Sequence, residues 1–432
     1  MDVKELVAGE LDSARRRSLE LLAPLSDHDL LRQISPIMSP LAWDLAHVGN
    51  YEELWLLRAI TGVPPIDASL DPLYDAFRHP RKNRPALPLL PPDRARRYLT
   101  EVRGRVLDTL DRLELAEDAP LLAGGRVYGM VIQHEHQHDE TMLATLQLME
   151  DEAYHPVAPP PPGGEVLRSR EVLVPGGPFT MGTDDDPWAY DNERPAHEVD
   201  VPAFWMDTAP VTNGQFLDFM GDGGYRHDRW WTLEGLDWRG ETGAEHPQFW
   251  RRETDGSWSR VRFGWQEPVP LNEPVQHVCW YEADAYSRWA GKRLPTEAEW
   301  EKAASWGSDG RKRLFPWGDT SPVSGAEAEA NLGQRHFRPA PIGAYPRGVA
   351  ASGCHQMVGD VWEWTASEFD AYPGFRSFPY REYSEAFFGS GYKVLRGGSW
   401  ATHATAVRTT FRNWDVPSRR QIFAGFRCAR DA

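Results

Sequence analysis

A run of prolines divides this sequence into two parts of different character. Residues 155–164 read HPVAPPPPGG. Because proline fixes φ and lacks a backbone N–H, the run belongs neither to a helix nor to the interior of a sheet. A chain of 432 residues is also long for one hydrophobic core. We therefore expect two domains, residues 1–154 and 171–432, joined by a stiff linker over 155–170.

The part before the linker has the periodicity of amphipathic helices. Apolar side chains recur every three or four positions, which places them on one face of a helix. In one segment, Ser39 and Pro40 are typical of a helix start and Gly62 of a helix end. Helices of this length predict a four-helix bundle of roughly 150 residues. The helical segments are 2–25, 39–62, about 93–113 and 125–150.

The part after the linker is richer in Gly, Pro, Trp and short β-type runs. The stretch LVPGGPFTMGT, 173–183, predicts a hairpin. Residues 282–305 predict two short helices, interrupted at Gly291 and Pro295. The runs VLRGGSWA and AGFRCAR predict strands. This pattern is typical of an α+β domain with much irregular backbone held by aromatic side chains.

Composition argues against several partners and locations. The net charge of −17 argues against nucleic acid and anionic membranes as partners. The first residues lack the apolar core of a signal peptide, and no later stretch is apolar enough to span a membrane. The three cysteines are an odd number and widely spaced, which is typical of reduced thiols. We therefore expect a cytoplasmic protein.

Two histidines in the last helical segment have the spacing of metal ligands. His134 and His138 are four residues apart and share one helix face, so their imidazoles can bind one ion. His136 points elsewhere. The pair alone fits two buried histidines equally well, and a third ligand is needed to decide. His47, in the middle of an apolar helical segment, is by itself more typical of a core residue.

The loop at 73–92 is locally basic in an acidic protein. Its prolines argue against a helix, and it carries Arg78, Arg81, Lys82 and Arg84. A solvated loop would explain these charges. Alternatively, the loop binds a substrate carboxylate, which guanidinium groups grip with two parallel hydrogen bonds.

After the linker, the sequence resembles the formylglycine-generating-enzyme (sulfatase-modifying factor) family, which has a C-type-lectin-like fold. One feature departs from that family. Its chemistry uses two cysteines five residues apart, and here Cys428 is present while position 423 is Phe. The fold therefore does not carry that activity. The matching blocks include VPGGPFTMGT (174–183), ERPAHEV (193–199), PVTNGQF (210–216), FPWGD (315–319), MVGDVWEWT (357–365), VLRGGSW (394–400) and GFRCAR (425–430).

The first part resembles DinB-type metal-binding helix bundles through His47 and the run HEHQH. The combination of the two parts, with SPLAWDLAHVGNYEELWLLR (39–58) and RNWDVPSRRQIFAGFRCA (412–429), resembles ergothioneine-biosynthesis sulfoxide synthases of the EgtB type. This resemblance implies a non-haem iron(II) enzyme that uses O2. Such an enzyme joins the sulfur of γ-glutamylcysteine to C2 of the imidazole of hercynine and oxidises the sulfur to a sulfoxide.

The resemblance also assigns roles by position, in a site expected between the two domains. His47 becomes the third metal ligand beside His134 and His138. Three imidazoles suit zinc equally well, so only the resemblance points to Fe(II). Tyr380 matches a proton-donating tyrosine, with Tyr383 as the fallback. The remaining positions are Arg81, Arg84, Asp415 and Arg419 for γ-glutamylcysteine, and Gln137, Asn413 and Trp414 for hercynine.

The sequence is also compatible with other functions. Free cysteine could replace γ-glutamylcysteine, although two loop arginines favour a thiol with two carboxylates. Ovothiol sulfoxide synthases have the same architecture with an added methyltransferase domain, which this sequence lacks. A DinB-type zinc-dependent thiol transferase would use the same three histidines. A non-catalytic lectin-like binding module would leave those histidines unexplained.

Overall fold

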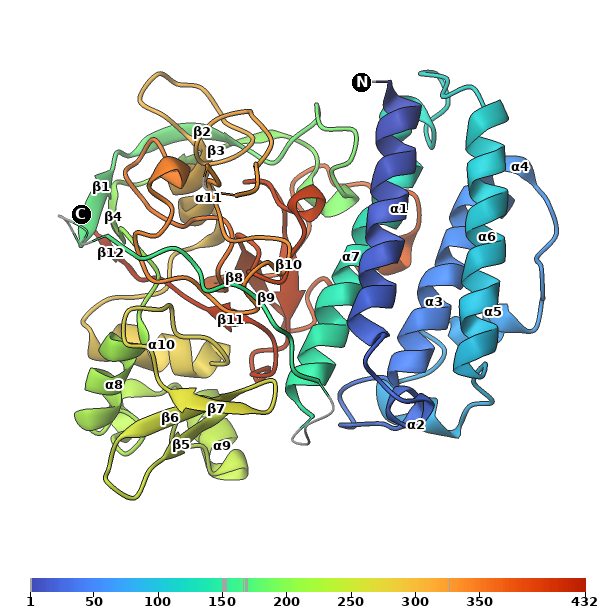
Figure 1. Ribbon diagram of the computed structural model, residues 1–432. Helices are drawn as coiled ribbons and strands as arrows, with labels where there is room; N and C mark the ends of the chain where they lie inside the picture. The colour runs from blue at the N-terminus through green and yellow to red at the C-terminus, as the bar shows by residue number, and fades with distance from the viewer. Residues whose placement is uncertain (1, 150–153, 166, 168–169, 326) are drawn as a thin grey trace. The chain divides into compact units, whose positions relative to one another are not determined.

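The N-terminal part of the chain folds into long helices, as the periodicity predicts (Figure 1). The structure is a computed structural model that describes residues 2–149, 154–165, 167, 170–325 and 327–432. Residues 150–153, in the first expected domain and at the end of its last helix, and 166, 168 and 169 of the expected linker lie outside the described residues. The chain divides into a first unit, Met1–His155 with Asp185–Trp188, and a second unit, Pro156–Asp184 with Ala189–Ala432.

The first unit is a helix bundle. Contacts join α1 to α6 and α7, and α3 to α6 and α7, so each of these helices has two neighbours among the others. A π-helical turn, η1, and a short α4 continue α3 to Gly62, whose left-handed φ of 72° ends the helix as predicted. The long helices in the described part are α1 (Val3–Leu22), α3 (Leu41–Glu53), α6 (Pro92–Arg112) and α7 (Arg126–Gln147); η1 is Leu54–Arg58 and α4 is Ala59–Thr61.

Two local predictions in this unit were wrong. Ser39 does not cap α3: Pro40 occupies the cap position, and the Ser39 hydroxyl accepts a hydrogen bond from Arg84 at 2.5 Å instead. The basic loop contains a 3₁₀ turn, η2 (Arg81–Ala86), despite Pro85. A short 3₁₀ helix needs few backbone N–H donors. The N–H that Pro85 lacks is not among those that it requires. The other short helices are α2 (Asp27–Leu31), α5 (Leu70–Tyr74) and η3 (Ala123–Gly125).

A short segment distant in sequence completes the first unit. Trp188 lies against Gly129 of α7, where a Cβ would come within 2.4 Å of the indole ring. Its indole N–H donates to the carbonyl of Gly124 at 3.1 Å, and Gln133 donates to the Trp188 carbonyl at 2.9 Å. Only glycine at position 129 allows this close approach to the helix.

The second unit is built from small sheets and short helices with long irregular connections (Figure 1). In the described residues the sheets have the orders β1-β4-β12, β10-β9-β8-β11, β2-β3 and β5-β6-β7, and only β11 pairs in parallel, with β8. The strands are β1 (Glu171–Val174), β2 (Gly177–Met181), β3 (His197–Val201), β4 (Phe204–Asp207), β5 (Trp250–Arg252), β6 (Trp258–Arg262), β7 (Trp265–Pro268), β8 (Trp362–Glu368), β9 (Lys393–Arg396), β10 (Asn413–Asp415), β11 (Ala424–Gly425) and β12 (Ala429–Asp431).

Helices cover part of these sheets. The two predicted between 282 and 305 are present, and Gly291 with φ of 68° separates them. The helices of this unit are α8 (Asn213–Gly221), α9 (Leu233–Thr242), α10 (Trp280–Trp289) and α11 (Glu297–Ser305). The 3₁₀ turns are η4 (Asp191–Glu193), η5 (Asp228–Trp230), η6 (Pro346–Gly348), η7 (Arg381–Tyr383), η8 (Glu385–Phe387) and η9 (Ala404–Ala406).

Strand pairing differs from the sequence prediction in two places. The stretch 173–183 is no hairpin, because β1 pairs with β4 while β2 pairs with β3. The stretch 424–430 is not one strand but two, β11 and β12, which belong to different sheets. In both cases the pairing partner lies far away in the sequence or in another sheet, which local patterns do not reveal.

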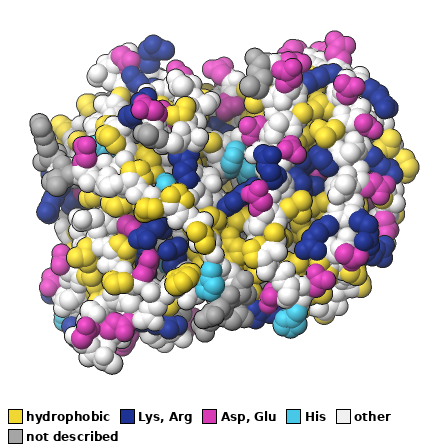
Figure 2. Space-filling model, viewed as in Figure 1, with side chains coloured by type: hydrophobic (Ala, Val, Ile, Leu, Met, Phe, Trp, Pro, Cys, Tyr) yellow, Lys and Arg dark blue, Asp and Glu magenta, His cyan; other side chains and the backbone are white. Residues whose placement is uncertain are grey.

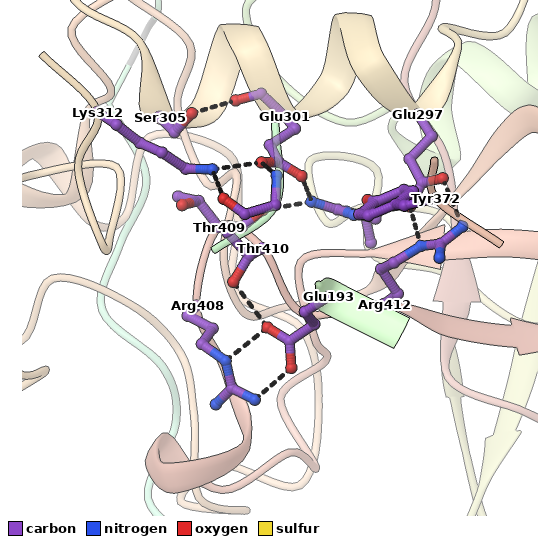
Figure 3. Close-up of polar contacts among 12 residues, drawn as sticks. Glu193, Glu297, Glu301, Ser305, Lys312, Tyr372, Arg408, Thr409, Thr410 and Arg412 are labelled. Atoms are coloured by element: carbon purple, nitrogen blue, oxygen red, sulfur yellow. Dashed lines mark hydrogen bonds and ion pairs between the residues drawn. The ribbon is translucent and has the colours of Figure 1, made fainter. Parts of the chain in front are cut away.

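Ion pairs run through the interior of the second unit (Figure 3). Arg396 of β9 contacts Glu297 and Glu301 of α11 at 2.7 Å each, and Lys312 contacts Glu301 at 2.7 Å. Arg412 binds Glu297 through Nε and Nη2, at 2.7 and 3.0 Å. These side chains, rather than regular backbone ladders, connect the irregular segments around α11.

Surface and thiol chemistry are unexceptional. Acidic and basic side chains are interspersed on the face drawn in Figure 2. Within the described residues, no helix combines the length and apolar character needed to cross a membrane. Cys279, Cys354 and Cys428 are buried and free.

Candidate metal centre and substrate residues

Three histidines of the first unit meet between α3 and α7. The ligand atoms of His47, His134 and His138 all lie within 4.8 Å of one another. Nε2 of His47 is 3.3 Å from Nε2 of His134, and the three ring centroids are 4.6 to 5.1 Å apart. His136 is not part of this cluster: its Nδ1 lies 3.2 Å from the carboxylate of Asp139. Three nitrogens converging on one point fit a single metal ion.

The Nδ1 atoms of His47 and His138 face oxygen atoms of the protein. Nδ1 of His47 lies 2.8 Å from the carbonyl of Tyr74, so it carries the proton and donates, which leaves Nε2 as a free base. Nδ1 of His138 lies 3.2 Å from Oδ1 of Asp44. This contact lacks hydrogen-bond geometry, so neither oxygen of the fully buried Asp44 has a hydrogen-bond partner among the described residues. A cation held by the adjacent imidazoles would compensate this buried charge, so the residues fit a bound metal.

Burial and stacking fix the state of the rings. Burial, and then the neighbouring His138, hold the pKa of His47 well below the ordinary histidine value. Burial, then His138 and then His47, lower the pKa of His134. His47 stacks on Trp43 at 4.6 Å, and His134 stacks on Tyr51 at 3.7 Å. His47 and His134 are therefore neutral at pH 7 and held in defined planes, as metal ligands require.

The basic loop contacts α3, the helix that carries His47. The Arg84 guanidinium lies 3.4 Å from the centroid of the Trp43 ring, which also stacks on His47. Its Nε, Nη1 and Nη2 each donate to the protein, to His79, Ser39 and Ala76. Burial lowers the pKa of Arg84 to about 10.

The other two sequence-assigned residues of this unit are less enclosed. Arg81 is half-buried, and its Nη1 donates to the carbonyl of Ile37 at 3.2 Å. Gln137, also half-buried, precedes His138 on α7. Both side chains therefore keep some exposure to solvent.

The second unit brings its own assigned residues together. Asn413, Trp414 and Asp415 form β10, and Asp415 pairs with Arg419 at 3.1 Å. The Trp414 ring stacks on Phe369 at 4.1 Å.

Aromatic rings connect this strand to the assigned tyrosines. Tyr383 lies edge-on to Trp414 at 5.8 Å and to Tyr380 at 6.2 Å. Tyr383 also stacks on Tyr190 at 4.2 Å. Trp414, Tyr380 and Tyr383 are thus members of one aromatic cluster.

Sequence reasoning missed the residues that support these clusters. Asp44 is three positions before His47 and Tyr51 four positions after it, so helical spacing alone could have placed them beside His47. Phe369 and Tyr190 lie far from Trp414 and Tyr383 in the sequence, and no local pattern indicates their contacts.

Comparison with known proteins agrees with this two-part organisation. Residues 10–142 match the DinB superfamily, and residues 161–432 match the sulfatase-modifying factor enzyme 1-like domain. The mouse formylglycine-generating enzyme is 30% identical over 350 residues, covering 74% of this chain and 90% of that protein.

Similarity to hercynine oxygenases extends over both parts. The hercynine oxygenase of Mycolicibacterium thermoresistibile is 53% identical over 435 residues, covering 98% of this chain and 94% of that protein. The hercynine oxygenase of Mycobacterium tuberculosis is 49% identical over the full length of both chains. The chain therefore belongs to the hercynine oxygenase family, oxidoreductases that combine a DinB-like helix bundle with a sulfatase-modifying-factor-like domain of C-type-lectin fold.

Proposed function

We propose that this protein is an iron(II)- and O2-dependent sulfoxide synthase of ergothioneine biosynthesis. It joins C2 of the hercynine imidazole to the sulfur of γ-glutamylcysteine and gives γ-glutamyl-hercynylcysteine sulfoxide. One O2 supplies the sulfoxide oxygen, and its other atom leaves as water together with the hydrogens of the C–H and S–H bonds. The observation that carries the proposal is the cluster of His47, His134 and His138 in a chain of this family.

The donor set suits a metal that binds substrates. Three neutral imidazoles leave the charge of a divalent cation uncompensated and up to three octahedral positions open. When bound, Fe(II) would supply the redox chemistry that O2 requires and that Zn²⁺ lacks. His47 is fixed for this role by the carbonyl of Tyr74 and the ring of Trp43, and His134 by the ring of Tyr51.

Arginines and one acidic residue bind the thiol substrate in this proposal. Arg81 and Arg84 bind carboxylates of γ-glutamylcysteine, while Asp415 and Arg419 bind its amino and carboxylate groups. Arg84 has five N–H groups, and three of its nitrogens already donate to the protein, so two N–H groups remain for a substrate. Among the described residues, the Arg81 guanidinium donates one hydrogen bond, to Ile37, so more of its N–H groups remain for a substrate.

Hercynine carries a quaternary ammonium and an imidazole. Trp414 provides one aromatic face for the ammonium. Phe369 stacks on the ring of Trp414 and holds it in place. Gln137 and Asn413 supply amide groups for the polar part of the molecule.

Tyr380 supplies a proton as O2 is reduced. A phenol can donate this proton while its ring stays packed, and the edge-on contact with Tyr383 supports the ring of Tyr380. Tyr383 is the alternative donor.

Anaerobic reconstitution tests the proposal. The metal-free protein is loaded with Fe(II) or Zn(II), mixed with hercynine and one thiol, and exposed to O2. We expect O2 uptake and the sulfoxide product, identified by mass, with Fe(II) and γ-glutamylcysteine. Equal turnover with Zn(II), or no product with either thiol, would contradict it. Product formed only from free cysteine, which has one carboxylate fewer, would replace the thiol but keep the reaction.

A further inference from the structure

A ring of four buried charges ties together the helices of the first unit. Arg15 comes from α1, Glu52 from α3, Arg103 from α6 and Glu135 from α7, so each long helix contributes one residue. Their exposed fractions are 7%, 0%, 9% and 2%. We call these residues the Arg–Glu quartet. Two positive and two negative groups balance its net charge.

Each arginine of the quartet bridges both glutamates. Arg15 contacts Glu52 at 2.6 Å and Glu135 at 2.7 Å. Arg103 contacts Glu52 at 2.6 Å and Glu135 at 3.3 Å. The remaining donors reach across the bundle as well: Arg15 donates to the carbonyl of Leu99 on α6 at 3.1 Å, and Arg103 donates to a carbonyl of α1.

The quartet lies close to the histidine cluster along the same two helices. Glu135 directly follows His134 on α7, and Glu52 is five residues after His47 on α3. The carboxylates of α3 and α7 repel each other, and the guanidinium groups between them allow both to be buried. A slip of α3 along α7 by one turn, about 5.4 Å, would leave charges buried without partners.

Buried ion pairs of this type contribute little net stability compared with apolar side chains of the same volume. Their expected effect is on the relative position of the elements that they join. The histidine cluster depends on that position, because His47 comes from α3 while His134 and His138 come from α7.

We propose that the Arg–Glu quartet is a positioning element of the metal centre, which fixes the register of α3 against α7 so that the three imidazoles meet at one ion. The inference rests on the proposed metal site. None of the four residues is expected to touch the metal or a substrate. Their effect passes through the helices that carry the ligands.

A matched pair of double variants tests this role in the full chain. Arg103→Met with Glu52→Leu removes one charge of each sign from the quartet and keeps its volume. Arg105→Met with Glu101→Leu removes an ion pair of 2.6 Å on the outer face of α6, where both side chains are about half exposed. Co(II) is the probe: affinity is measured by competition with a chelator, geometry by the d–d absorption spectrum, and folding by circular dichroism and urea unfolding.

We expect the inner double variant, Arg103→Met with Glu52→Leu, to stay folded. It should bind Co(II) about tenfold more weakly and show a changed d–d spectrum, because residues that orient metal ligands affect metal affinity to this extent. The outer variant should match the unaltered protein. Equal affinity and spectra in the two variants would overturn the inference. An unaltered protein that binds no Co(II) would defeat the metal proposal itself and the inference with it.

A milder change covers the case in which the inner double variant does not fold. Arg103→Lys keeps the charge but loses the forked contact to both glutamates. It should weaken Co(II) binding about threefold relative to Arg105→Lys, less than the loss of a residue that orients a ligand directly. Identical Co(II) binding by these two folded single variants would overturn the inference.

Discussion

The two units both keep charged networks in their interiors, but they use them on different kinds of backbone. In the helical unit, Arg15 and Arg103 join long regular helices through Glu52. In the lectin-like unit, Arg396 at the end of β9 and Arg412 just before β10 both contact Glu297 of α11. Figure 3 shows the contact of Arg412 with Glu297.

This difference matches the proposed roles of the two units. The first holds metal ligands, and the second holds substrate residues. Metal ligands must be positioned within fractions of an ångström, which rigid helices allow. Three assigned substrate residues of the second unit form β10, only three residues long, and the assigned tyrosines lie at the turn η7. Arg412 precedes β10 and binds Glu297, and it also donates to the carbonyls of Asn192 and Asp370. In this unit the position of the site depends on side-chain contacts.

The largest expected effect comes from the metal ligands. His47→Ala should remove most bound Fe(II) and reduce turnover to background, because two imidazoles on α7 cannot replace the third. Metal analysis after anaerobic reconstitution measures the loss, with exposed His28→Ala as the control. Full iron occupancy in His47→Ala would refute the three-ligand assignment.

Replacing the proposed proton donor should change the products and leave the amount of metal intact. Tyr380→Phe keeps the ring and its contact with Tyr383 while it removes the hydroxyl. Without that proton, oxidation of the thiol alone becomes the easier route, and each ~1.4 kcal/mol of barrier changes the branch about tenfold. We expect sulfinate to gain on sulfoxide by one to two orders of magnitude.

Single-turnover product ratios, with Tyr392→Phe as the control, test this outcome. An unchanged ratio would exclude Tyr380 from the mechanism. Tyr383→Phe would then be the next variant to measure.

Breaking the network of the second unit should separate the two units' roles. Arg412→Met removes one partner of Glu297, which keeps Arg396. Loss of a buried partner costs about 3 kcal/mol in the free energy of unfolding. We expect a lower urea midpoint and weaker hercynine binding, while Fe(II) content stays at the level of the control Arg288→Met, which removes an exposed arginine paired with Asp284 at 2.8 Å. A loss of iron equal to the loss of stability would show that the two networks do not act separately.

The same contrast explains what the sequence could predict. The helices of the first unit depend on contacts within one turn, so periodicity located them to within a few residues, and Gly62 marked its helix end correctly. Spacing placed His134 and His138 on one helix face, which fits two buried histidines as well as two metal ligands. Spacing gave no link to the proposed third ligand, because His47 lies 87 residues before His134 and the packing of α3 on α7 joins them. The resemblance supplied that pairing.

The failures cluster where partners are distant. Ser39 has the residue type of a cap, but its hydroxyl binds Arg84, 45 residues away. The stretch 173–183 looks like a hairpin locally, yet β1 pairs with β4 and β2 with β3. Side chains such as Phe369, on which Trp414 stacks, carry no signal in the local sequence at all.

The smallest expected effect concerns the two loop arginines, which the structure makes unequal. Among the described residues, the Arg81 guanidinium makes one hydrogen bond to the protein, whereas the Arg84 guanidinium makes three and covers Trp43 beside His47. Arg81→Ala should therefore raise the KM for γ-glutamylcysteine about tenfold, the lower end for a charge-assisted contact of about 1.5–3 kcal/mol, and leave hercynine and Fe(II) binding unchanged. Arg84→Ala should affect the thiol and also loosen metal binding, because it removes the support of Trp43. Exposed Lys82→Ala is the control on the same turn. Equal losses for both substrates in Arg81→Ala would mean that the loop shapes the site and does not read the thiol.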